Sequence, residues 1–180
     1  MYPRSDPVPG GGQIPFFDAI QMPPGMSTGT LTNNVVYLTH TRFDVSITIP
    51  KMRLFIGTAA GNWDAGYYTD DNGDGTYVLE ARVGDTVAAG SSADQDASFA
   101  TPITLQAGRN YWRALFTSNA TLQTKRITSY GDITSRRPKW CMAVGATYAT
   151  ARGGQPGLPD TLSGVTIAHS VLVDIAGIAS

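Results

Sequence analysis

The sequence predicts an all-β protein, an antiparallel β-sandwich that follows an extended arm. Short runs of aromatic and β-branched residues recur along the chain, and clusters rich in Gly, Asp and Asn separate them. No segment has convincing helical spacing. The best candidate, residues 87–97, is rich in alanine but contains Gly90, Ser91 and Ser92, so we expect a loop there.

The arm comprises residues 1–29, in which prolines alternate with glycines. Proline fixes φ and removes a hydrogen-bond donor, so neither a helix nor a central strand is expected. Residues 30–180 then form a single β-sandwich domain, which is long enough to bury its own core. The arm also carries apolar side chains that need a covering surface, either on its own domain or on a partner. The candidate partner-binding residues are Phe16, Phe17, Ile20 and Met22.

Strand patterns follow one another from residue 31 onward. Apolar residues alternate with polar ones over residues 43–49, which predicts a half-buried strand that stops at Pro50. A second alternating strand is expected at residues 52–56. The remaining strands are predicted at residues 35–38, 63–68, 77–83, 99–105, 110–117, 122–130, 140–148, 161–169 and 171–178. About ten strands at this spacing are typical of a sandwich or barrel.

The composition argues against several classes of protein. With 13 basic and 14 acidic residues, the chain gives no electrostatic reason to expect a nucleic-acid partner. The single cysteine, Cys141, cannot form an intramolecular disulfide, and its apolar neighbours indicate a buried thiol. The first residues lack the apolar region of a signal peptide, and no window approaches the roughly 18 apolar residues of a membrane span. We therefore expect a soluble protein, made in a cytoplasm, with no membrane partner.

One acidic turn matches the opening of a calcium loop, with Asp70, Asn72 and Asp74 at alternate positions. The last position of such a loop needs a glutamate, but Ala81 stands there and Glu80 falls one residue short. A hairpin turn is the favoured interpretation, and weak calcium binding is the alternative. We expect no cofactor.

Catalytic groups are sparse. His40 and His169 are the two histidines, and neither accompanies a nucleophile motif. A glycosidase would need two carboxylates at a fixed separation, and the candidates are Asp64, Glu80, Asp85, Asp94 and Asp96. We expect a protein that is not an enzyme.

One basic cluster lies between residues 125 and 139. Arg136 and Arg137 at its centre belong either to a solvated loop or to a docking site for an acidic surface. They complete the set of candidate partner-binding residues.

Three patches resemble small bacteriophage virion β-sandwich proteins. The first is Asn-x-Asp-x-Gly-x-Tyr, here residues 62–68. The second is a Leu-x-x-Gly-x-x-Tyr strand from Leu105, and the third is Leu-Pro-x-Thr-Leu at residues 158–162. The resemblance extends in strand order over residues 31–178 and is specific at these patches alone.

The resemblance implies a jelly-roll-like fold and a structural role on a phage particle. The function it favours is that of a capsid decoration (cement) protein, a homotrimer docked on the major capsid protein at the virion surface. The alternative is a tail or fibre module that binds host surface glycans, with sugar rings stacked on Trp63, Tyr67, Tyr68 or Trp112. A small hydrolase is the third possibility.

Elementary geometry predicts three details of these patches. Gly66 should leave room for a large neighbour such as Trp63 or Tyr68. Gly108 should supply a turn conformation closed to residues with a Cβ. Tyr111 and Trp112 should face opposite sides of their strand, one toward the core and one outward.

Overall fold

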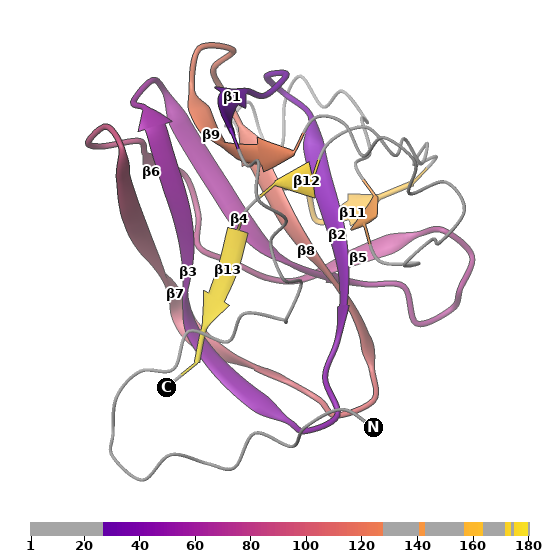
Figure 1. Cartoon of the computed structure of the whole chain (residues 1–180). Coiled ribbons are helices and arrows are strands. Elements are labelled where there is room, and N and C mark those ends of the chain that lie inside the picture. Colours follow the sequence, from indigo (N-terminus) through magenta and orange to yellow (C-terminus); the bar gives the residue numbers. More distant parts are fainter. Residues whose placement is uncertain (1–26, 128–140, 143–156, 164–171, 174, 180) are drawn as a thin grey trace, which may run out of the picture.

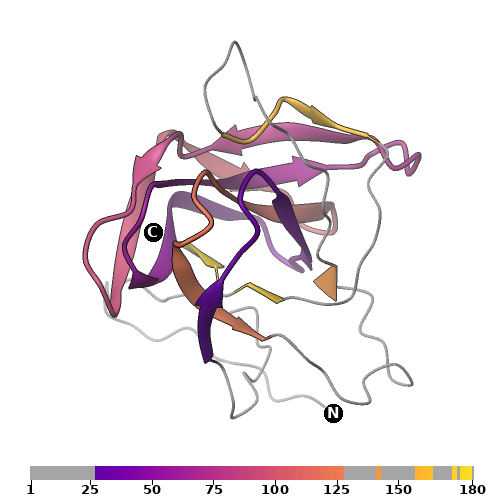
Figure 2. The same cartoon turned by 90° about the horizontal axis from the view of Figure 1, so that it is seen from above.

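The computed structural model describes residues 27–127, 141–142, 157–163, 172–173 and 175–179. These residues contain strands and turns but no helix, and the strands form two antiparallel sheets (Figures 1 and 2). The predicted all-β antiparallel sandwich is confirmed. Residues 1–26 of the predicted arm lie outside the described residues, whereas Ser27 already belongs to a strand, three residues before the predicted domain boundary.

The first sheet is organised around the long strand β3 (Ile47–Thr58). Along one edge β3 pairs with β7 (Ala93–Leu105), and along the other it pairs with β13 (Ile175–Ile178) and β9 (Gln123–Ile127). The strand β9 in turn pairs with β1 (Ser27–Thr30) and β12 (Leu172–Val173).

The second sheet has β8 (Asn110–Thr117) between β2 (Val36–Arg42) and β4 (Asn62–Thr69). The strand β4 pairs with β5 (Tyr77–Arg82) and with the short β6 (Thr86–Val87). Two-residue strands complete the edges among the described residues: β10 (Cys141–Met142) pairs with β2, and β11 (Thr161–Leu162) pairs with β5.

A folded two-stranded ribbon joins the sheets. The pair β2–β8 in one sheet continues as the pair β3–β7 in the other, and the chain turns the corner at residues 43–46 and 106–109. At this corner the backbone N–H of Gly108 donates to the carbonyl of Phe43 at 2.8 Å, and that of Ala107 donates to Ser46 Oγ at 3.0 Å. Gly108 has a φ of 75°, as the sequence predicted. This ribbon is the jelly-roll-like element of the fold.

Two strand predictions are wrong in ways that have a physical cause. Pro50 does not end a strand, because β3 continues through it and the register with β7 shifts between Ile49 and Lys51. A bulge accommodates the missing N–H, so the two predicted strands are one. The predicted loop at residues 87–97 is correct for residues 88–92, but β7 begins at Ala93.

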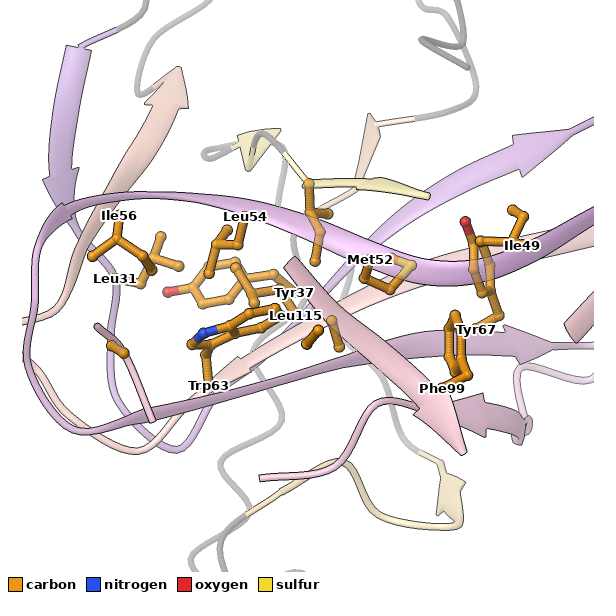
Figure 3. Close-up of a cluster of buried hydrophobic side chains, with 14 of the residues drawn as sticks. Leu31, Tyr37, Ile49, Met52, Leu54, Ile56, Trp63, Tyr67, Phe99 and Leu115 are labelled. Carbon is orange, nitrogen blue, oxygen red and sulfur yellow. The ribbon is translucent and has the colours of Figure 1, made fainter. Parts of the chain in front are cut away.

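The main core fills the space between the sheets. It contains fully buried Leu54 and Met52 from β3, Trp63 and Tyr67 from β4, and Leu115 from β8 (Figure 3). Successive side chains of a strand face opposite sides of its sheet. The inward residues of β8 therefore join this core, while its alternate residues face away from it.

A second apolar cluster lies on the other face of the second sheet. From β8, Ala114 and Phe116 belong to this cluster, and both are buried. Tyr68 of β4 and Tyr77 of β5 pack with them, and Leu158 covers them from outside the sheet. The second sheet is thus buried on its inner face and over part of its outer face, which a two-layer sandwich with a polar outer face does not require.

Candidate functional site

Two of the three sequence patches meet in space. Residues 157–162, which we call the strap, lie against the strand that carries the Asn62–Tyr68 motif. The buried carboxylate of Asp64 accepts hydrogen bonds from the backbone N–H of Leu158 and of Gly84, both at 2.9 Å. The guanidinium of Arg82 bridges the two sides, because Nη1 lies 3.4 Å from Asp64 Oδ2 and 3.2 Å from the carbonyl of Leu158.

Opposing effects act on the ionisation of Asp64. Burial raises the pKa of this carboxyl, while the hydrogen bonds from Leu158 and Gly84 and the charge of Arg82 lower it. Burial is the largest effect, so the pKa lies above its ordinary value. The contacts of Asp64 with two backbone donors and one cation hold the strap against the sheet, so the role they indicate is structural.

The strap has further contacts to the second sheet. Tyr68 donates its hydroxyl hydrogen to the carbonyl of Pro159 at 2.6 Å, and the N–H of Leu79 donates to the carbonyl of Asp160 at 2.8 Å. Leu158 and Leu162 are buried in the second cluster. The Leu-Pro-x-Thr-Leu patch is therefore part of the scaffold.

Gly66 is required for a reason other than the predicted one. A Cβ at this position would lie 2.2 Å from the carbonyl oxygen of Ala81 and 3.0 Å from the Cα of Arg82. The close neighbour is the backbone of β5, at a register shift between β4 and β5, and not a large side chain of the same motif.

The acidic turn has the hydrogen bonds of a hairpin connection. Asp70 Oδ2 accepts from the N–H of Gly75 at 3.3 Å, and Asp74 Oδ1 accepts from the N–H of Thr76 at 2.8 Å. Asp71 forms an ion pair with Arg109, which also contacts Glu80 Oε1 at 2.8 Å. Among the residues that the structure describes, no three His, Cys, Asp or Glu side chains are grouped so that they could hold a metal ion.

The carboxylates considered for glycoside cleavage belong to several separate contacts. Asp85 accepts from Asn62 at 2.7 Å, and Glu80 accepts from Thr69 at 3.0 Å. Asp96 pairs with Arg53 at 2.6 Å and with Lys51 at 2.7 Å. The hydrogen bond from Arg53, assisted by Lys51, lowers the pKa of Asp96 from 3.8 to about 2.

The aromatic residues considered for sugar stacking divide sharply by exposure. Trp63, Tyr67 and Tyr68 are at most 1% exposed, so none of them presents a ring to a ligand. Tyr111 faces the main core, and Trp112 faces the opposite side and is half-buried, as the alternation predicted. Trp112 is the one residue of that stacking set that is not buried.

Trp112 belongs to a four-residue group on the outer face of the second sheet, which we call the aromatic–polar patch. His40 pairs with Trp112 across β2 and β8, and Arg42 pairs with Asn110 two residues further along. The rings of His40 and Trp112 meet edge to face at 4.9 Å, and His40 Nε2 lies 3.2 Å from Asn110 Oδ1. This group was not predicted, although the two-residue spacing of its members on each strand would have placed them on one face.

Other predicted site residues are not described. Seven of them lie outside the described residues: Phe16, Phe17, Ile20, Met22, Arg136, Arg137 and His169.

The backbone of Cys141 pairs with Thr39 in the second sheet. The part of the chain that the structure describes forms no helix long and apolar enough to cross a membrane.

Comparison with known proteins gives no assignment. No protein-family model, no curated protein and no solved structure matches the chain.

Proposed function

We propose that this chain is a structural protein of a bacteriophage virion that decorates the capsid. In this proposal the β-sandwich projects as a homotrimer, and the segment before β1 docks on the major capsid protein. The proposal rests on the distribution of apolar and charged groups in the described domain, together with the sequence patches that resemble phage virion proteins.

The observation that carries the proposal is that the recognisable motifs act in the scaffold. Asp64 and Tyr68 of the first patch hold the strap, which contains the third patch. In the second patch, Gly108 forms the corner and Leu115 fills the core. A fold whose distinctive residues serve packing is suited to a durable display unit.

The surface of the described domain adds a second argument. The large apolar side chains exposed among the described residues are Val45, Val78 and Val87, which belong to three different segments. Single exposed apolar residues do not make an interface. The concentration of Phe16, Phe17, Ile20 and Met22 before β1 therefore makes that segment the better candidate for the docking element.

The alternative function, recognition of a host glycan by a tail or fibre module, loses three of its four stacking candidates to the core. Trp112 alone keeps a ring near the surface. We therefore rank capsid decoration first.

The test is a binding assay with capsids that lack this protein. Deleting residues 1–26 leaves β1 intact and should abolish sedimentation with the capsids, and replacing Phe16, Phe17, Ile20 and Met22 by serine should do the same. The matched control replaces exposed Val45 and Val87 by serine and should bind as the parent does.

Several outcomes would refute parts of the proposal. Unchanged capsid binding after the deletion would end the docking role of residues 1–26. A parent protein that binds no capsid lattice would end the decoration function itself. Light scattering should give three times the mass of the chain, and a monomer at micromolar concentration would contradict the homotrimer.

A further inference from the structure

We infer that the aromatic–polar patch is a binding site for a glycan, which it would hold through one pyranose ring. The inference does not depend on capsid decoration, because a projecting domain can carry such a site on any particle or cell surface. It rests on the arrangement of Trp112, His40, Arg42 and Asn110 on one face of β2 and β8.

The ring of Trp112 has a fixed orientation. Tyr77 meets it edge to face at 5.2 Å and an angle of 83°, and His40 meets it at 4.9 Å and 62°. Tyr77 is buried, and Trp112 packs against the second apolar cluster while remaining half-buried as a residue. A rigid aromatic surface loses little conformational entropy when a ligand packs on it.

The polar members of the patch complement sugar hydroxyls. Arg42 and Asn110 are exposed and form the neighbouring cross-strand pair. Guanidinium, carboxamide and imidazole groups offer planar hydrogen-bond donors, and the carboxamide of Asn110 also offers an acceptor. The apolar C–H face of a pyranose ring packs on the indole, and its hydroxyls reach these groups at the rim.

The size of the patch selects this class of ligand. Adjacent strands lie about 4.8 Å apart, and alternate residues of a strand lie about 6.7 Å apart, so four residues in two pairs cover the footprint of about one sugar ring. A stable protein partner needs roughly 800 Å² per side. The nearby apolar side chains that would enlarge the patch, such as Tyr68 and Tyr77, are buried.

The experiment uses the full chain on a printed array of bacterial surface oligosaccharides, both neutral and uronic-acid-containing, followed by calorimetric titration of the strongest binder. Trp112→Ala should weaken binding about tenfold or more, equivalent to ~1.4 kcal/mol. Asn110→Ala changes an exposed side chain and should weaken binding severalfold without affecting folding. The control Val87→Ala, on an exposed side chain of another strand, should bind as the parent does.

Three results would overturn the inference. The first is a parent chain that binds no sugar on the array. The second is binding that is unchanged in Asn110→Ala, an exposed position that tests the patch even if Trp112→Ala fails to fold. The third is a concentration-dependent dimer that Trp112→Ala abolishes, since a second copy of the chain would then cover the patch. Deletion of residues 1–26 should abolish capsid binding and leave sugar binding intact. The two proposals can therefore fail separately.

Discussion

The side chain of Asp64 shows how one buried carboxylate can hold two distant segments together. It is fully buried, and it joins Gly84 and Leu158 through backbone donors on its two oxygens. Removing one partner of a buried charged pair costs about 3 kcal/mol, because the groups that remain are still shielded from water and no longer have a partner. The contribution of Asp64 therefore lies in keeping the strap on the sheet.

We predict that Asp64→Asn lowers the free energy of unfolding by about 3 kcal/mol. The oxygen of a carboxamide can accept from one backbone N–H, but its NH₂ group, itself a donor, then faces the other N–H. Arg82 also loses its counter-charge. Urea unfolding measures the change. Asp94→Asn, on an exposed acid of β7, is the control and should change stability by less than about 0.5 kcal/mol. Equal effects of the two variants would contradict the structural role of Asp64.

Asp96 makes the stability of the fold depend on pH. Its pKa in the folded chain is about 2, below the ordinary 3.8, because Arg53 and Lys51 stabilise the ionised form. The folded state therefore binds this proton less readily than the unfolded state. The stabilisation is fully present above about pH 4 and is lost as the pH falls toward 2.

We predict that Asp96→Asn destabilises the protein by at most about 1 kcal/mol at pH 7, since the pair is partly solvent-screened. The stability difference between parent and variant should shrink steadily between pH 4 and pH 2. Parallel urea titrations at several pH values measure it. A difference that stays constant over this range would show that Asp96 does not titrate in the ion pair.

Two buried threonines offer a gain in stability. The hydroxyls of Thr117 and Thr124 are buried and have no hydrogen-bond partner among the residues that the structure describes, and both residues are 0% exposed. Valine has the same shape without the hydroxyl, so each Thr→Val change should stabilise the fold by about 1 kcal/mol. Thr69→Val is the opposing control, because its hydroxyl donates to Glu80. Thermal unfolding measures the change. The melting temperature should rise in the Thr117 and Thr124 variants and fall in the Thr69 variant.

At the scale of elements, Gly66 allows the backbones of β4 and β5 to approach closely next to the register shift between them. We predict that Gly66→Ala costs about 3 kcal/mol, because the new Cβ would collide with the carbonyl of Ala81 and the backbone of β5 would have to move. Gly73→Ala, where the Cβ meets nothing within 4 Å, should cost only the roughly 1 kcal/mol of its positive φ. Calorimetry separates the two costs, and equal melting temperatures would contradict the close approach.

The strands differ in how far local pattern determined them. The bounds of β8 follow from its alternation and flanking turn, and the structure has it at residues 110–117 as predicted. Pro50 misled the prediction of β3 because a single-residue rule ignores the bulge that a partner strand can supply. A loop was predicted at residues 93–97 because their small and acidic side chains have low strand propensity. Pairing with β3 nevertheless imposes an extended backbone on them.

The candidate site was less predictable than the fold. Alternation alone places Tyr111 and Trp112 on opposite faces without saying which faces outward. His40, the cross-strand neighbour of Trp112, lies 72 positions earlier, and its position depends on the register of β2 against β8. That register pairs two segments far apart in the sequence, and no local pattern specifies it. The burial of Tyr68 likewise depends on the strap, which is distant in sequence.

At the scale of the whole molecule, the second sheet separates two apolar clusters of different kinds. The main core is enclosed by two sheets, whereas the second cluster is closed in part by Leu158 and Leu162 of the strap. The strap pairs with β5 at Thr161 and Leu162, and Asp160 accepts one more backbone hydrogen bond from Leu79. Regions held by few backbone hydrogen bonds open at lower free energy than a core sheet.

We therefore predict that the strap opens separately from the sandwich. Leu162→Ala should accelerate hydrogen exchange at the strap amides, such as that of Leu158, and at Leu79, which donates to Asp160, while leaving amides of β8 unchanged. Leu115→Ala, in the main core, should lower the protection of both regions and cost about 3 kcal/mol globally. If Leu162→Ala reduces protection in β8 as much as in the strap, the two clusters unfold as one cooperative unit. Preserved β8 protection instead makes the strap a layer added to a sandwich that is stable without it.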